Sequence, residues 1–170
     1  MATLLLDLLT PEEEAVDERT REFRFDIPLL AERLMLATDW SQANAATHGL
    51  ACGYFGASTG AAAALIAAAE RPALIRAVVS RGGRPDLAAS ALRRVRCPVL
   101  LIVGSLDTEV LTLNRRAAAE LAGHREISIV RDATHLFEEP GALAEVAELA
   151  VRWFATYLPR ASREEAPPSH

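Results

Sequence analysis

The sequence predicts an α/β fold, with a mostly parallel sheet of about five strands and helices on both of its faces. Short apolar runs of strand length alternate along the chain with longer segments of helical periodicity. Only 5% of the 170 residues are aromatic, and alanine dominates the apolar set, which favours close packing of helices on a sheet. Strands that alternate with helices are typical of a parallel sheet.

The first part of the chain contains two of these expected strands. The continuous apolar run Ala2–Leu9 predicts a strand that is buried on both faces. Thr10 and Glu13 then have the spacing of a capping box, which predicts the start of a helix. We expect the acidic tract 12–18 to be a solvated face or a mobile loop. The remaining predicted elements of this part are a helix over 27–39, a strand over 50–57 and an alanine-rich helix over 59–70.

The second part continues the alternation. Its predicted strands cover 76–80, 98–104 and 126–130, and its predicted helices cover 87–94, 110–122 and 140–157. The last helix is expected to bury one stripe formed by Leu143, Val146, Ala150, Phe154 and Tyr157. The polar, proline-rich end predicts a single domain over residues 1–158 and a disordered tail over 159–170.

Composition and charge exclude several classes of protein. The net charge is −5 and no basic stripe is present, which argues against a nucleic-acid partner. No run of about 18 apolar residues predicts a membrane span. All 18 basic residues are arginine, as in GC-rich bacterial coding. Cys52 and Cys97 lie in apolar runs, so we expect reduced thiols and a cytoplasmic protein. Metal-ligand spacing is missing as well, so neither a metal nor another cofactor is expected.

The segment Gly56-Ala57-Ser58-Thr59-Gly60 matches the G-x-S-x-G pattern at a predicted strand-to-helix junction. In that context the serine sits on a strained turn and can act as a nucleophile. The N–H of Thr59 would face a developing oxyanion, assisted by the positive end of the following helix. The alternative is a serine that merely caps an alanine-rich helix.

Two further strand ends supply partners for Ser58. Asp107 follows the strand over 98–104, and His135 follows the strand over 126–130. Their order along the chain fits a nucleophile, then an acid, then a base. The carboxyl ends of parallel strands share one edge, where such sheets place their sites. Asp107 could instead cap a helix, with Glu109 or Asp132 as the acid, and His135 could be a surface residue.

The segments 53–60, 80–86, 104–107 and 133–137 resemble the α/β-hydrolase superfamily, and most closely its dienelactone-hydrolase-like branch. The resemblance extends to about Leu158. It implies that Ser58 is the nucleophile, Asp107 the acid and His135 the base. Members proper carry cysteine at the elbow, so Ser58 favours another small carboxylic ester or thioester as substrate. Arg81 and Gly82 are expected to border the substrate pocket, although a tight turn would also explain the glycine.

The resemblance also implies that some strands of the family's sheet are not represented. One of them normally separates the strand resembling Ala2–Leu9 from that over 50–57, and it carries a loop with the second oxyanion N–H. We therefore expect either that Ala2–Leu9 moves into this position or that the position stays empty. In both cases the chain should form homo-oligomers or bind a partner that covers the missing strand.

Two other functions remain open from the sequence. The chain could be a catalytically impaired fragment or an interaction module that keeps the fold. It could also bind a dinucleotide, because Gly53, Gly56 and Gly60 have a fingerprint spacing and Arg81 or Arg84 could hold a 2′-phosphate.

Overall fold

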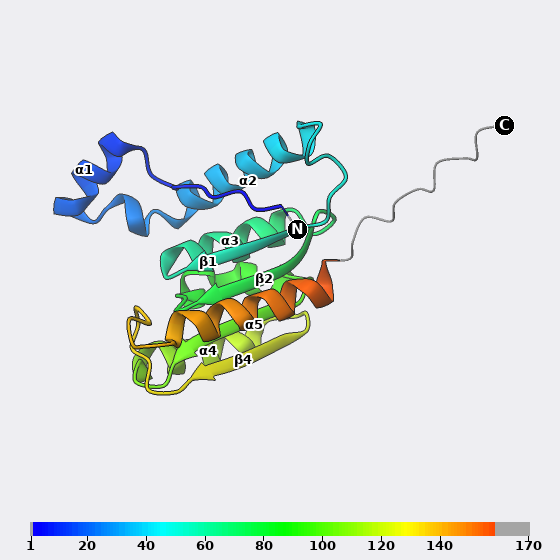
Figure 1. The fold of residues 1–170 in the computed structure, drawn as a ribbon. Coiled ribbons are helices and arrows are strands. Elements are labelled where there is room, and N and C mark those ends of the chain that lie inside the picture. The colour runs from blue at the N-terminus through cyan, green and yellow to red at the C-terminus, as the bar shows by residue number, and fades with distance from the viewer. Residues whose placement is uncertain (1, 159–170) are drawn as a thin grey trace.

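The computed structural model describes residues 2–158, and its centre is a four-stranded parallel sheet in the order β1-β2-β3-β4 (Figure 1). The strands are β1 (Cys52–Ala57), β2 (Ile75–Arg81), β3 (Val99–Gly104) and β4 (Arg125–Val130). All six residues of β3 are buried, as expected for an apolar strand with neighbours on both sides and helices on both faces. The expected tail over 159–170 lies outside the described residues.

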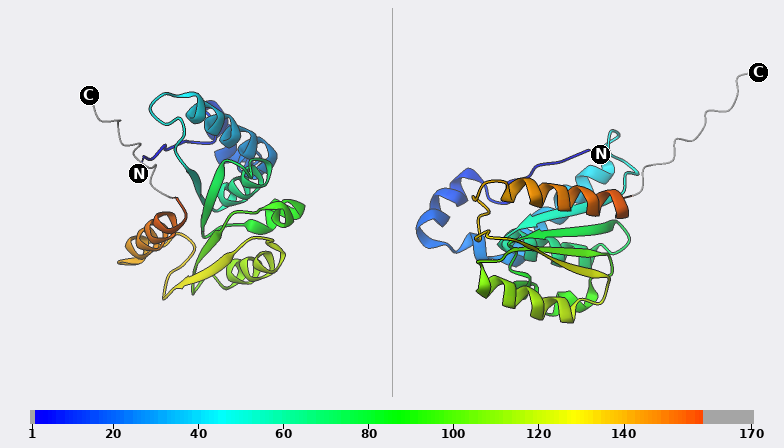
Figure 2. Two further views of the ribbon diagram at one scale, coloured as in Figure 1. Left: turned by 90° about the vertical axis from the view of Figure 1, so that its right-hand side faces the viewer. Right: turned by 60° about the horizontal axis from the view of Figure 1, so that its bottom comes forward.

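Helices cover both faces of this sheet, as the sequence predicts (Figure 2). Five α-helices and two 3-10 segments are found among residues 2–158. They are α1 (Pro11–Thr20), η1 (Phe23–Phe25), α2 (Ile27–Ala43), α3 (Thr59–Glu70), η2 (Pro85–Arg94), α4 (Thr108–Glu120) and α5 (Ala142–Tyr157). Helices α3 and α4 lie on one face with η2, whereas α5 crosses the other face. Alanines of α3 are fully buried, which allows α2 to pack closely outside α3.

The predicted strand over Ala2–Leu9 is wrong, and the sheet has four strands instead of about five. The segment runs alongside α2 and does not pair with any described strand. Leu8 and Leu9 pack against the core, and the Leu8 carbonyl accepts a hydrogen bond of 2.7 Å from Arg33 Nη1. Leu5 is 89% exposed. The apolar run therefore contacts the helical layer on one side only, which is insufficient to make it a buried strand.

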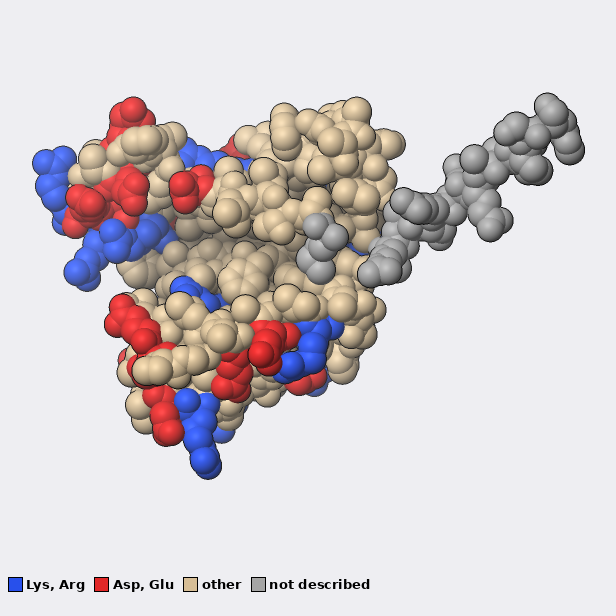
Figure 3. Space-filling model, in the orientation of Figure 1, with Lys and Arg blue, Asp and Glu red and all other residues tan. Residues whose placement is uncertain are grey.

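Strand β1 is consequently an edge strand, paired only with β2 among the described strands. Its side chains alternate between the two faces. The Tyr54 hydroxyl is 2.7 Å from Thr38 Oγ1 of α2, and burial raises the pKa of Tyr54 to about 12. Phe55 lies on the opposite face and is 50% exposed. Figure 3 shows a largely uncharged hollow on this side of the molecule, between the N-terminal helices and α5. Among residues 2–158, no strand takes the position beside β1 on this side.

Helix α1 confirms one expectation from the sequence and corrects another. The capping box is confirmed, because Thr10 Oγ1 accepts from the Glu13 N–H and Glu13 Oε2 accepts from the Thr10 N–H. The acidic tract after it is helical and not wholly solvated. Asp17 is 2% exposed and binds Arg24, which compensates for the burial of its charge.

The buried stripe of α5 differs from the predicted one. The structure buries Ala142, Val146, Ala150 and Trp153, while Leu143 is 51% exposed. Phe154 and Tyr157 remain partly buried beside this stripe. The prediction is therefore shifted by one residue at two positions, since Ala142 is buried in place of Leu143 and Trp153 in place of Phe154. Trp153 points toward the sheet, and its ring stacks on His124.

Candidate active site

The junction between β1 and α3 forms a sharp turn at Ser58. Its backbone has φ 49° and ψ −121°, a conformation that non-glycine residues rarely adopt. The Ser58 N–H donates to the Arg81 carbonyl at 3.2 Å, and the Ser58 carbonyl accepts from the Arg84 N–H at 3.0 Å. These bonds to the end of β2 and the loop beyond it hold the strained turn in place. The sequence pattern correctly predicts a strained serine at a strand-to-helix turn.

The two glycines of the motif have different surroundings. A Cβ atom on Gly56 would lie 2.6 Å from the Gly60 carbonyl oxygen, so the first turn of α3 requires glycine there. A Cβ atom on Gly60 would meet only Leu8, at 3.9 Å. Thr59 is the first residue of α3, and its N–H is therefore among those without an acceptor inside the helix. This N–H is available to an anion beside Ser58.

Asp107 and His135 are directly bonded, although 28 positions separate them in the chain. His135 Nδ1 lies 2.7 Å from Asp107 Oδ2. With an ionised carboxylate, this geometry makes Nδ1 the donor and leaves Nε2 as the free ring nitrogen. The His135 side chain is 39% exposed, whereas that of Asp107 is 13% exposed. The ring can therefore reach solvent or a ligand while its carboxylate partner is shielded.

Asp107 lies in the loop after β3 and His135 in the loop after β4, and several hydrogen bonds join these two loops. The N–H groups of Ser105 and Leu106 donate to the carbonyls of Val130 and Ala133, at 2.9 and 3.0 Å. Ser105 Oγ accepts from the Asp132 N–H at 2.8 Å. The loops also approach too closely for a side chain at Gly104, where a Cβ atom would lie 2.2 Å from the Ala133 oxygen. Their close contact fixes the spacing between the carboxylate and the imidazole.

Arg81 and Gly82 lie at the same edge. Gly82 has φ +50°, and a Cβ atom on it would lie 3.1 Å from the His135 oxygen, so its glycine permits the close approach of the histidine loop. The Arg81 guanidinium is 5.8 Å from the centre of the Phe137 ring. Its Nε is buried and has no hydrogen-bond partner within residues 2–158. The Arg81 carbonyl therefore binds the turn that carries Ser58, whereas its guanidinium lies over Phe137 of the histidine loop.

The structure joins two of the three expected catalytic side chains and places the third at the same edge. Within the described chain, the hydrogen bonds of His135 do not include one to Ser58 Oγ. The link between them is indirect, since the Ser58 N–H binds the Arg81 carbonyl and the next residue, Gly82, packs against His135. The rival acids Glu109 and Asp132 are both exposed, and Asp107 holds the imidazole.

Two polar residues near the edge, the buried Asn114 and the partly exposed Glu139, were not predicted from the sequence. Asn114 of α4 is 0% exposed, and its Nδ2 donates to the carbonyls of Gly83 and Val110 at 2.9 and 2.8 Å. Glu139 accepts a hydrogen bond of 3.0 Å from the Thr134 N–H, next to His135. Hydrogen bonding to Thr134, first through its side chain and then through its N–H, lowers the pKa of Glu139 below its usual value. An amide inside an otherwise apolar helical stripe was the available signal for Asn114, whereas Glu139 lies in a loop without periodicity.

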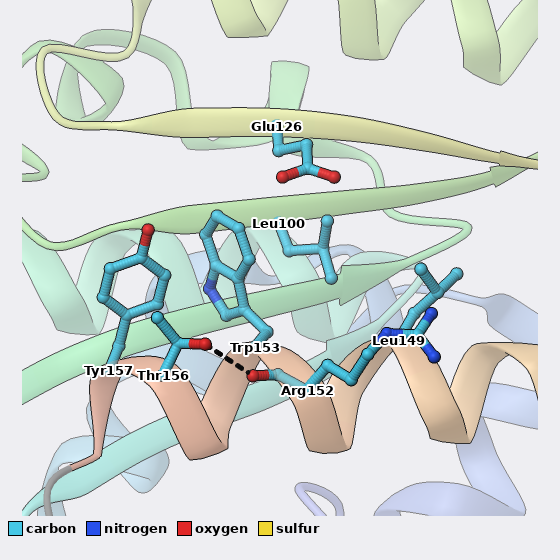
Figure 4. Close-up of a pocket in the computed structure, with 7 residues that line it drawn as sticks. All are labelled: Leu100, Glu126, Leu149, Arg152, Trp153, Thr156 and Tyr157. Carbon is cyan, nitrogen blue, oxygen red and sulfur yellow. Dashed lines mark hydrogen bonds between the residues drawn. The ribbon is translucent and has the colours of Figure 1, made fainter.

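A separate cavity of about 260 Å³ lies at the opposite end of the sheet (Figure 4). It is lined by Leu100, Glu126, Leu149, Arg152, Trp153, Thr156 and Tyr157. Leu100 and Glu126 are near the amino ends of their strands, whereas Ser58, Asp107 and His135 follow carboxyl ends. This cavity is therefore distinct from the edge described above.

Two further features of residues 2–158 bear on other kinds of site. No helix among them is both long and apolar enough to cross a membrane. The same residues contain no group of three or more histidine, cysteine, aspartate or glutamate side chains arranged to hold a metal ion.

Comparison with solved structures identifies the family. A dienelactone hydrolase from Anabaena variabilis is 59% identical, with a TM-score of 0.87, over 90% of this chain and 71% of that one. This chain belongs to the dienelactone-hydrolase branch of the α/β hydrolases. A serine hydrolase homologue from Coxiella burnetii and a dienelactone hydrolase-like promiscuous phosphotriesterase from metagenomic libraries share the fold, at 21% and 17% identity and TM-scores of 0.63 and 0.61. A scan against models of known protein families matches none.

Among curated proteins, this α/β hydrolase is similar to a "putative phosphoribosyl transferase" from two strains of Mycobacterium tuberculosis. The identity is 57% over 157 residues, which is 92% of this chain and 34% of the relative. The chain thus spans about a third of the curated relatives it matches. The name applies to whole proteins that are about three times as long as the segment matched here.

Proposed function

We propose that this α/β hydrolase cleaves small carboxylic esters or thioesters with Ser58, His135 and Asp107. The hydrogen bond between Asp107 Oδ2 and His135 Nδ1 is the observation that carries the proposal. It orients the imidazole and leaves Nε2 free to accept a proton. A strained serine on the same sheet edge supplies the nucleophile. The missing contact between Ser58 and His135 is compatible with this role, because such bonds often tighten only when substrate binds.

In the proposed reaction, Ser58 Oγ attacks the carbonyl carbon while His135 Nε2 takes its proton. The tetrahedral oxyanion accepts a hydrogen bond from the Thr59 N–H. Collapse of this intermediate breaks the bond to the leaving alcohol or thiol, which receives the proton from His135. Water then attacks the acyl-serine by the same route and releases the acid and free Ser58. Asp107 remains ionised and stabilises the imidazolium in both steps.

Arg81 and Gly82 border the proposed substrate. Glycine at position 82 keeps the space next to His135 open, and Nε of the Arg81 cation has no hydrogen-bond partner within residues 2–158. A substrate with a second, anionic group would satisfy this cation. The dinucleotide alternative is less favoured, because it gives no role to the bond between Asp107 and His135.

Labelling with a fluorophosphonate tests the proposal directly, because this probe reacts with an activated serine. The full chain should be labelled at Ser58, with no labelling of Ser58→Ala and strongly reduced labelling of His135→Ala. Thr108→Ala, at an exposed position beside the acid, is a matched control that should label normally. If the folded chain resists the probe, the alternative of a catalytically impaired module is supported instead. Labelling that survives in Ser58→Ala assigns the nucleophile elsewhere.

A further inference from the structure

The loop that carries His135 contains backbone strain. Asp132 has φ 56° and Phe137 has φ 58°, both in the left-handed region that residues other than glycine rarely occupy. Such conformations persist only where surrounding contacts hold them. Phe137 is fully buried and anchors one side of the loop in the core. His135 lies between the two strained residues, so its orientation depends on what holds this segment.

Glu139 connects the loop to helix α5. Its carbonyl accepts from the Ala142 N–H at 3.0 Å, which fixes its backbone at the first turn of the helix. Its side chain turns back, and Oε1 accepts from the Thr134 N–H at 3.0 Å. The carboxylate thus joins the residue before His135 to a rigid element, across a gap of five positions.

The second carboxylate oxygen of Glu139 has no partner. Oε2 is buried and makes no hydrogen bond within residues 2–158. A buried unpaired oxygen is costly, so a residue that served only as a loop turn would be better replaced by a neutral side chain. Hydrogen bonding to the side chain and the N–H of Thr134 also lowers the pKa of Glu139, so the carboxylate is ionised near neutral pH. An ionised acceptor makes the bond to the Thr134 N–H stronger than a neutral one.

From these contacts we infer that Glu139 is a positioning residue, whose carboxylate holds the His135 imidazole against Asp107 through the Thr134 N–H. The inference rests on the proposed function for its catalytic consequence. The effect of Glu139 on the orientation of the His135 ring does not depend on the proposed function. Gly82 packs against the His135 oxygen, and Glu139 holds the N–H of Thr134, the residue directly before His135.

Three variants of the full chain separate this role from a general effect on stability. Glu139→Ala removes the acceptor, Glu139→Gln keeps an oxygen for the Thr134 N–H, and Glu138→Ala changes the exposed neighbouring glutamate. With p-nitrophenyl acetate, Glu139→Ala should lose about tenfold to a hundredfold in kcat with KM little changed, as expected for a small misplacement of a catalytic group. Glu139→Gln should retain most of the activity, and Glu138→Ala should behave as the original chain.

A second readout does not depend on catalysis. The ¹⁵N shifts of the His135 ring report which nitrogen carries the proton. In the original chain and in Glu139→Gln they should indicate one tautomer, protonated at Nδ1, and in Glu139→Ala a mixture. If the original chain does not hydrolyse the ester, the proposed function fails while the ring shifts still test Glu139. An unchanged tautomer in Glu139→Ala overturns the inference, as does a glutamine variant that is as impaired as the alanine variant.

Discussion

Asp107 uses its two carboxylate oxygens for two different partners. Oδ2 lies 2.7 Å from His135 Nδ1, and Oδ1 accepts from the Val110 N–H at 3.4 Å. The same side chain therefore orients the imidazole and caps helix α4. The interpretation of Asp107 as a helix cap and its interpretation as the acid of a triad are compatible, because a carboxylate can accept from both directions at once.

Replacing Asp107 by asparagine or alanine should separate its two contributions. Asparagine keeps an acceptor for α4 but no longer favours the Nδ1–H tautomer, so turnover should fall by up to about 10⁴-fold with little change in stability. Alanine should additionally cost about 0.5–2 kcal/mol in the free energy of unfolding, because the cap is lost. Ester hydrolysis and urea unfolding of both variants provide the test. Near-normal turnover of the asparagine variant would remove Asp107 from the mechanism.

Gly104→Ala should destabilise the protein because the new Cβ would lie 2.2 Å from the Ala133 oxygen. We expect a loss of about 1–3 kcal/mol in the free energy of unfolding, as for other overpacked sites. Gly60→Ala is the matched control, since its Cβ would meet only Leu8 at 3.9 Å and alanine is the better helix former. The control should be as stable as the original chain or more so in urea. Equal stability of the two variants would contradict the close contact of the loops.

Acid should weaken the N-terminal capping box. The Arg33 side chain and the Thr10 N–H bind Glu13 and lower its pKa from 4.5 to about 2. Because the folded-state pKa is the lower one, this stabilisation is fully present above about pH 4.5 and is lost as the pH falls toward 2. Thermal unfolding between these pH values should be less pH-dependent in Glu13→Gln than in the original chain. Parallel curves for the two proteins would argue against the pair.

The isolated 170-residue chain should self-associate through the open side of β1. That strand has one unpaired edge among the described strands, and Phe55 is 50% exposed beside it. Unpaired strand edges with apolar side chains promote pairing between molecules. Size-exclusion chromatography with light scattering should detect oligomers, and Phe55→Lys should reduce them. A monodisperse monomer with a cooperative unfolding transition would show that the open edge is tolerated.

Arg81→Gln should change substrate preference more than chemistry. If the Arg81 cation binds an anionic group of the substrate, KM should rise for an ester that carries a second carboxylate, with a smaller effect on kcat. Hydrolysis of a neutral ester of the same size should be nearly unchanged. Steady-state kinetics with a half-ester of a dicarboxylic acid and its neutral diester make the comparison. Equal effects on both would show that Arg81 has a structural role.

Local patterns predicted most of the fold and the edge of the sheet on which the proposed site residues lie. Ser58, Asp107 and His135 each follow a strand, and parallel strands necessarily bring their carboxyl ends to one edge. The pattern failed for Ala2–Leu9, because an apolar run is the same whether it pairs in a sheet or lies on a helical layer. The sequence pattern also did not predict the role of Glu139, because its contact with Thr134 depends on the conformation of the loop between β4 and α5. The need for glycine at position 104 depends on Ala133, which belongs to a different loop.

The mutual bonding of the two loops has a consequence for how this protein can diversify. Backbone hydrogen bonds and Gly104 constrain both the loop after β3 and the loop after β4. In contrast, the side chains of Leu106 and Leu136 project outward and are 59% and 54% exposed. Each of them is the immediate neighbour of Asp107 or His135. Substitutions at these two leucines would therefore change the surface beside Asp107 and His135 without moving either of these residues. The proposed catalytic pair and the exposed side chains beside it are adjacent in the chain, so single substitutions at these leucines would change the surface next to the pair.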